Sequence, residues 1–200
     1  MFANDHKAGI LPSAKALTTL CTMPAFNPES GNDVIRSVCS LGDDFRKQAA
    51  ETRLAIYELF FLLVTDAQVS SDLQYQHGEA GRFMTDIIQL CRSERDPKNI
   101  MLWLCILETF LTEYSPSADV TLEIFEAFSS YFPISLRTSN HPSGITRTDL
   151  KVALRRCFAA HDRVSGHAIP HLVQYLDRPE GGNTVDVKVS SPSHSSSSQI

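Results

Sequence analysis

Hydrophobic residues along the chain recur with the three-to-four-residue spacing of amphipathic helices. Stripes of this kind cover, in order, 11–23, 34–41, 52–65, 83–91, 99–114, 120–131, 150–161 and 169–176. The segments 52–65 and 99–114 are apolar almost all round, which indicates helices that pack on more than one side. The segment 185–189 alternates as a strand would, but it stands alone between Gly-rich and Ser-rich flanks. The pattern therefore predicts an all-α protein.

Polar clusters with Gly or Pro mark the corners between these helices. We expect 67–81 to be a loop, because it is polar and contains Gly78 and Gly81, and 165–166 (Ser-Gly) to separate the last two helices. Thr146 has the residue type of an N-cap, and Asp149, three residues on, places a carboxylate where it favours a helix N-terminus. Pro97 suits the first turn of the helix that follows it.

The predicted helices group into four pairs, 10–41, 51–92, 97–131 and 146–177. Each pair is a helix, a corner and a second helix, and its length is near the roughly 40–47 residues of HEAT and armadillo repeats. One pair exposes an apolar face that it cannot bury alone, so the pairs must stack. We therefore predict an α-solenoid of about four HEAT-like helical hairpins over residues 10–178, with apolar faces at both ends of the stack because neither end looks like a polar capping repeat.

A change in composition follows the last predicted helix. A Pro-Glu-Gly-Gly-Asn cluster begins at residue 179, and the final residues read SSPSHSSSSQI. Such a segment has too few apolar side chains to form a packed core. We predict that 179–200 is a disordered tail.

Overall composition limits the classes of partner. Of the 200 residues 42% are apolar, and the formal net charge is -5, which gives no broad electrostatic reason to bind nucleic acid or an anionic membrane. Unbroken apolar runs such as 59–64 are far too short to cross a bilayer. The first residues lack the pattern of a secretory or transit peptide. We expect a cytosolic or nuclear protein with no direct contact to nucleic acid or membrane.

One group of residues has the types and spacing of a metal site. Cys157 and His161 are four residues apart on one helix, and His167 and His171 are four apart around the start of the next, so the two pairs could hold zinc. We prefer the alternative that Cys157 belongs to the apolar stripe and that the histidines cap helix ends or meet solvent at the corner. The five cysteines are far apart, with no CxxC pair, and are typical of small buried hydrophobes in a reducing compartment.

Neither catalytic nor cofactor-binding motifs occur in the sequence. It contains no GxGxxG, P-loop, GxSxG or HExxH pattern. Trp103 with Phe110, Phe125 and Phe128 could form an aromatic cage, but their helical spacing favours core packing. We predict no enzyme activity, no catalytic residue, no cofactor and no bound metal.

A small basic face is the one candidate for a partner contact. Arg147, Lys151, Arg155 and Arg156 share a side of the helix that begins after Thr146. They suit an acidic partner, although most clusters of this kind are solvated faces without a partner. Both interpretations stay open at this point.

Residues 131–177 resemble a known family. The succession YFPI, a Pro/Gly loop, GITRTDLKVALRRCFAAHDR and HAIPHLVQYLD is similar to the N-terminal part of the large HEAT-repeat targeting subunit of cytosolic iron–sulfur assembly. This family is also described as nucleotide-excision-repair and TFIIH-linked and is named for methyl-methanesulfonate sensitivity. Earlier segments, notably TRLAIYELFFLLV and the corner DPKN, look similar too, so the resemblance covers roughly 10–178 in a fungal-like form.

The resemblance implies an adaptor without chemistry of its own. Its partners would be other cytosolic iron–sulfur assembly subunits and iron–sulfur client proteins such as DNA helicases and polymerases, in the cytoplasm and the nucleus. Members of the family are several times longer and continue into another amphipathic helix where this chain turns Gly- and Ser-rich. We therefore expect a fragment, a truncated gene model or an alternative product. Two other hypotheses remain: a generic helical-repeat scaffold in transcription or trafficking, and a small metal-binding domain.

Overall fold

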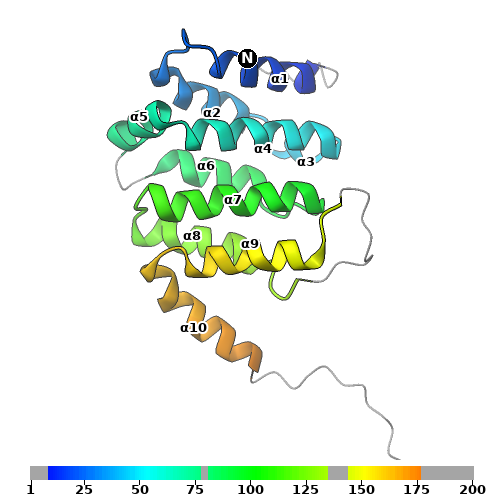
Figure 1. Ribbon diagram of the computed structural model, residues 1–200, viewed down its shortest axis with the longest axis vertical. Coiled ribbons are helices and arrows are strands. Elements are labelled where there is room, and N and C mark those ends of the chain that lie inside the picture. Colours follow the sequence, from blue (N-terminus) through cyan, green and yellow to red (C-terminus); the bar gives the residue numbers. More distant parts are fainter. Residues whose placement is uncertain (1–8, 78–80, 135–143, 177–200) are drawn as a thin grey trace, which may run out of the picture.

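The computed structural model describes residues 9–77, 81–134 and 144–176. These residues form helices and no strands, which confirms the all-α prediction (Figure 1). The predicted tail 179–200 and the alternating segment 185–189 lie outside the described residues. In order, the elements are α1 (Ile10–Cys21), η2 (Pro28–Ser30), α2 (Gly31–Cys39), α3 (Asp43–Arg46), α4 (Ala50–Thr65), α5 (Ala67–His77), α6 (Arg82–Cys91), α7 (Pro97–Glu113), α8 (Ala118–Ser129), α9 (Arg147–Ala159) and α10 (Asp162–Leu176).

The helices form two stacked layers. In one layer α1 packs on α4, α4 on α7 and α7 on α9 (Figure 1). In the other, α2 packs on α6, α6 on α8 and α8 on α10. The four predicted pairs therefore correspond to α1/α2, α4/α6, α7/α8 and α9/α10, and the chain is an α-solenoid of helical hairpins.

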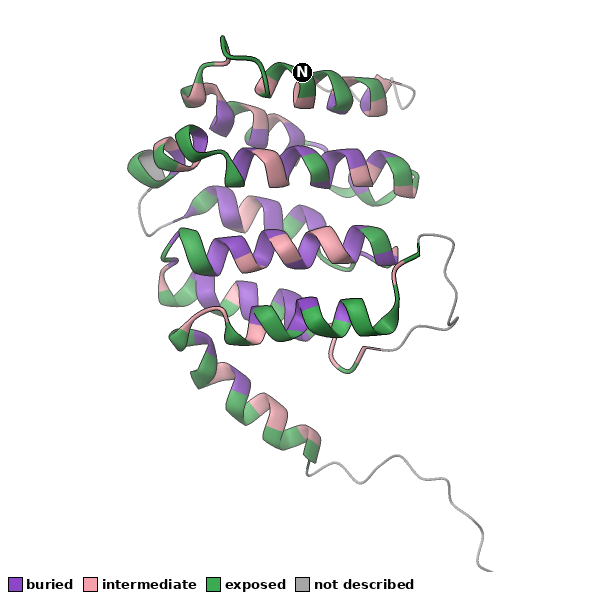
Figure 2. Cartoon of the chain, viewed as in Figure 1, coloured by how far each residue is buried: buried purple, intermediate pink, exposed green. Residues whose placement is uncertain are grey.

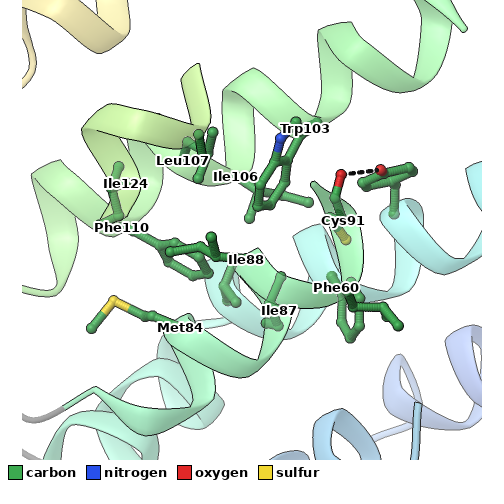
Figure 3. Packing of buried hydrophobic residues seen from close by; sticks show 14 of the residues in the cluster. Phe60, Met84, Ile87, Ile88, Cys91, Trp103, Ile106, Leu107, Phe110 and Ile124 are labelled. Carbon is green, nitrogen blue, oxygen red and sulfur yellow. Dashed lines mark hydrogen bonds between the residues drawn. The ribbon is translucent and has the colours of Figure 1, made fainter. Parts of the chain in front are cut away.

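Helices α4 and α7 lie inside their layer, each between two neighbours, which is why their sequences are apolar on most sides. Burial follows this arrangement in Figure 2, where buried residues are concentrated in the inner helices and the first and last helices are mostly exposed or intermediate. Trp103 and Phe110 of α7 and Phe125 and Phe128 of α8 are all buried, so core packing is the correct interpretation of these aromatics. Figure 3 shows Trp103 and Phe110 among the aliphatic side chains of α6 and α8.

Two predicted helix starts are confirmed by their capping hydrogen bonds. The Thr146 hydroxyl accepts from the Asp149 N–H at 3.2 Å, and the Asp149 carboxylate accepts from the Thr146 N–H at 2.8 Å. This reciprocal pair is a capping box, which satisfies two backbone donors at once. At the start of α7, the Asp96 carboxylate accepts from the N–H groups of Lys98 and Asn99, with Pro97 in the first turn.

The predicted loop over 67–81 is wrong for most of its length. Helix α5 occupies Ala67–His77. Asp66 caps it by accepting from the N–H groups of Gln68 and Val69, and Val69 and Leu73, four residues apart, are buried. Because this helix buries only a narrow stripe against α4 and η2, its polar residues hid the helical period.

The predicted break at 165–166 is also wrong. Helix α10 starts at Asp162 and runs through Gly166 and Pro170 to Leu176. The corner lies earlier, at His161, where the His161 ring and the Asp162 carboxylate both accept from the Arg163 N–H. The buried side chains of α10 are Val164 and Ala168, so the predicted stripe from Ile169 to Leu176 lies mainly on its outer face.

Long-range hydrogen bonds and an ion pair join neighbouring parts of the stack. Tyr114 donates to the Val64 carbonyl at 2.7 Å, and Tyr57 donates to the Cys91 carbonyl at 3.4 Å. Arg53 of α4 pairs with Glu94 in the corner between α6 and α7.

Among the described residues no single helix is long and apolar enough to cross a membrane. One pair of helices, Ala50–Thr65 with Ala67–Tyr75, has the required length and apolar character when taken together, but it is bent by 75°.

Candidate functional site

The four candidate metal ligands point to different partners. The Cys157 thiol is buried in α9 and donates to the Leu104 carbonyl of α7 at 3.3 Å. His161 lies at the corner, where its Nδ1 accepts from the Arg163 N–H. His167 and His171 both lie against the ring of Phe125, with centroid distances of 5.6 Å. Within the ranges that the structure describes, no three His, Cys, Asp or Glu side chains are grouped closely enough to hold a metal ion.

All five cysteines are free thiols in environments that keep them protonated. Burial raises the pKa of Cys39 to about 12 and raises the pKa of Cys91 and Cys157 as well. The pKa of Cys21 and of Cys105 is also raised, mainly by burial. Because the thiolate is the form that binds metal and attacks electrophiles, these cysteines suit packing rather than chemistry.

The predicted basic face lies on the outside of α9. Arg147, Lys151, Arg155 and Arg156 are all exposed, while Leu150, Ala153, Leu154 and Cys157 of the same helix are buried. Arg147, Lys151 and Arg155 follow one another at four-residue spacing and form one row. Arg156 is turned away from this row, towards α7, where its charge acts on the Cys105 thiol. The structure therefore brings together three of the four predicted residues.

An apolar groove runs beside this basic row. It has a volume of about 420 Å³ and lies between α9, α10 and the segment Phe132–Ile134 that follows α8. Leu154 and Phe158 line it from α9, and Leu172 lines it from α10. Lys151 and Arg155 also line this groove, so the apolar wall and the positive charges share one surface.

Both ends of the described stack carry exposed apolar side chains, as predicted. On α10, Ile169 is 62% exposed and Leu176 is 84% exposed, and Val173 lies between them. On the first pair, Leu20 and Met23 are about half exposed. These faces resemble the sides of internal repeats, which normally lie against a neighbour.

Sequence reasoning missed a second basic site. A pocket of about 450 Å³ lies between α3, α4 and the corner from α6 to α7. Arg46, Arg53, Arg92 and Arg95 line it, together with the buried Glu94. These residues are spread over 50 positions of the chain, and only the charged corner Arg92–Arg95 was visible as a local signal.

Stacked helical hairpins, exposed charged rows and apolar grooves define an α-solenoid scaffold, a class that works through its surfaces. The particular family follows from comparison with known proteins. Residues 2–188 match the model of the N-terminal region of MMS19, described as Dos2-interacting transcription regulator of RNA-Pol-II. The chain belongs to the MMS19 family.

Relatives from distant eukaryotes support this assignment. The chain is 27% identical to the DNA repair/transcription protein mms19 of Schizosaccharomyces pombe over 92% of its own length. It is 30% identical to the MMS19 nucleotide excision repair protein homolog of Mus musculus over 86% of its length. It spans only 17% and 16% of these two curated relatives, respectively. No solved structure matches the chain.

Proposed function

We propose that this chain is part of a non-catalytic adaptor that targets cytosolic iron–sulfur assembly to apo-proteins of DNA repair, replication and transcription. Membership of the MMS19 family over residues 2–188 is the observation that carries the proposal. The resemblance of residues 131–177 to the targeting subunit of the assembly machinery supports the iron–sulfur role. The names of the relatives, which refer to DNA repair, transcription and nucleotide excision repair, support this class of client.

The surfaces of the stack suit an adaptor. A row of cations on α9 and the apolar groove beside it offer both charge and apolar contact to a protein partner. The cysteines also favour an adaptor, because they do not suit a bound cluster. Burial raises the pKa of Cys39, Cys91 and Cys157, which disfavours the thiolate form that binds iron, so in this proposal the cluster stays with partner proteins.

The proposed partners are the other subunits of the assembly machinery and client proteins such as DNA helicases and polymerases. We place the adaptor in the cytoplasm, where assembly takes place, and in the nucleus, where repair and transcription clients work. The row on α9 is proposed to meet an acidic surface of one of these partners, because opposite charges steer association and fix its register.

The two competing hypotheses have less support. A small metal-binding domain would need Cys157 as a thiolate, whereas its thiol is buried, donates to the Leu104 carbonyl and has a raised pKa. A generic scaffold in transcription or trafficking would not explain a family match over nearly the whole chain.

A retention assay tests the proposal. The full 200-residue chain is immobilised and exposed to purified assembly subunits and to the apo and holo forms of an iron–sulfur helicase. An unrelated α-solenoid of similar net charge serves as the control surface. We expect retention of an assembly subunit or of the apo helicase on this chain and not on the control. Equal retention on both surfaces, or none where the mouse relative retains the same proteins, would overturn the proposal.

A further inference from the structure

The arginine pocket, defined by Arg46, Arg53, Arg92 and Arg95, concentrates positive charge in an acidic chain. Four arginines and a single carboxylate, that of Glu94, line a hollow of about 450 Å³, although the whole chain has a formal charge of -5. Arg46 comes from the end of α3, Arg53 from the first turn of α4, and the other two from the corner between α6 and α7. Segments far apart in the sequence thus converge on one site.

Glu94 offsets only one of the four positive charges, because its hydrogen-bonding capacity is used by Arg53 and by its own corner. Its Oε1 accepts from the Arg53 side chain at 2.8 Å and from the N–H groups of Arg95 and Asp96 at 2.8 and 2.9 Å. Its Oε2 accepts from the Arg53 Nε at 2.8 Å and from the Asn99 amide at 3.4 Å. Arg53 and Glu94 therefore satisfy each other, and the positive charges of Arg46, Arg92 and Arg95 are left without a carboxylate from Glu94.

Arg46, Arg92 and Arg95 form no ion pair with any carboxylate in the part of the chain that the structure describes. Asp43 and Asp86 share the neighbouring hollow with Arg46 but do not approach it within the 4.0 Å of an ion pair. Each of the three arginines is exposed. Their side chains are thus available to an incoming anion.

The backbone of the corner holds two of these arginines in place. Ser93 adopts a left-handed conformation with φ of 71°, and Glu94 ties the next two N–H groups to its own carboxylate. Arg92 and Arg95 therefore start from a fixed turn rather than from a free loop. A site organised before binding loses less entropy when its ligand arrives.

We propose that the arginine pocket binds an acidic segment of a partner protein through the carboxylates of Asp and Glu side chains. The guanidinium fork matches a carboxylate in a two-bonded geometry, and a pocket of this volume has room for more than one such side chain. Nucleic acid is the less suitable occupant, because the negative charge of the rest of the chain repels a long phosphate backbone. This inference goes beyond the proposed function, since no client or assembly subunit enters it.

Peptide titration of the full chain tests the proposal. The probes are a fluorescent 12-residue peptide rich in Asp and Glu, its Asn/Gln counterpart, a peptide with phosphoserine at the acidic positions, and a short DNA duplex. We expect the acidic peptide to bind at least about tenfold more tightly than the Asn/Gln peptide, with an affinity that falls as salt rises. Equal binding of the two peptides, or tighter binding of the phosphopeptide or the duplex, would overturn the assignment of the ligand.

Matched variants locate the site. The triple variant Arg46→Gln/Arg92→Gln/Arg95→Gln removes three charges from the pocket and leaves the Arg53–Glu94 pair in place. The control variant Lys15→Gln/Arg36→Gln/Arg82→Gln removes three exposed charges that lie outside both the pocket and the α9 row. We expect the pocket variant to weaken acidic-peptide binding about tenfold or more and the control to keep most of it, with unchanged circular dichroism in both. An unaffected pocket variant, or an equal loss in the control variant, would contradict the proposal. Because no assembly protein or client takes part, failure here leaves the retention assay untouched.

Discussion

The guanidinium group of Arg53 holds the carboxylate of Glu94 through two hydrogen bonds of 2.8 Å between residues 41 positions apart. The Glu94 side chain is only 1% exposed and the Arg53 side chain 16%. The pair fixes the corner between α6 and α7 against the start of α4, and Asn99 of α7 joins it by donating to the Ala50 carbonyl. One buried ion pair therefore ties the second helical pair to the third.

Removal of Glu94 should strongly destabilise the stack. In Glu94→Ala the buried Arg53 charge loses its partner, and breaking such a pair costs about 3–5 kcal/mol. Urea denaturation followed by circular dichroism measures the loss in the free energy of unfolding. The control Glu51→Ala removes a mostly exposed carboxylate from α4, the helix of Arg53, and should change stability by less than about 0.5 kcal/mol. Equal losses in both variants would contradict the role of the pair.

The Arg53–Glu94 pair also makes the free energy of unfolding depend on pH. Burial alone would raise the pKa of Glu94, but the hydrogen bonds from Arg53 and from the Asp96 and Arg95 N–H groups outweigh it and lower the pKa. Since the folded pKa lies below the unfolded one, the unfolded chain binds more protons in the interval between them, and stability rises with pH there. We expect the contribution of Glu94 to be complete above its ordinary pKa of 4.5 and to be lost as pH falls through the folded value.

Denaturation midpoints of the natural chain and of Glu94→Gln, measured from neutral to acidic pH, check this expectation. The neutral amide resembles the protonated carboxyl, so the difference between the two proteins should shrink as the pH falls. A difference that stays constant down to about pH 3 would show that Glu94 does not titrate with folding.

The packing of α5 on α2 is tested at Gly31. A Cβ atom at this position would lie 2.5 Å from the Val69 Cγ1, and a β-branched side chain has little freedom to move aside. Gly31→Ala should therefore destabilise by about 1–3 kcal/mol, less the fraction of a kcal/mol that alanine gains in a helix. In a Val69→Ala background the same change should be neutral or stabilising. If Gly31→Ala costs the same free energy of unfolding in both backgrounds, the close contact between α2 and α5 is refuted.

The aromatic core between α7 and its neighbours should dominate stability. Phe110 is fully buried, whereas Tyr75 is 91% exposed, so the two aromatic side chains form a natural comparison. Phe110→Ala should cost about 3–5 kcal/mol and Tyr75→Ala less than about 0.5 kcal/mol. Thermal and chemical denaturation of both variants measure the contrast. Similar losses would mean that the core is not where the two layers meet.

Charge reversal on α9 tests the proposed partner surface. Lys151→Glu/Arg155→Glu should slow association with an assembly subunit or client about tenfold at low salt, because rim charges act mainly on the association rate. The variant Arg36→Glu/Lys98→Glu, with the same change of charge on other helices, is the control. Surface plasmon resonance at two salt concentrations separates the rates. Identical association rates for the two variants would exclude α9 from the interface.

The sequence predicted the helices that bury wide apolar faces, the cap at Thr146 and the place of Pro97 in the first turn of α7. It failed at α5, where Val69 and Leu73 are the buried residues among those whose side chains are described, and most of the others are polar. It failed again at α10, because Ser165 and Gly166 look like a break until the cap at His161 is seen in three dimensions. The arginine pocket was out of reach for a similar reason, since Arg46 meets Arg92 only through the stacking of distant segments.

Native mass spectrometry tests the central claim most directly. The full chain is mixed with purified assembly subunits and an apo iron–sulfur client, and all species are weighed in one spectrum. The account predicts complexes of this chain with a subunit or with the client, while the free chain has the mass of the polypeptide alone. A free chain that carries stoichiometric iron, zinc or a cluster and forms none of these complexes would contradict it.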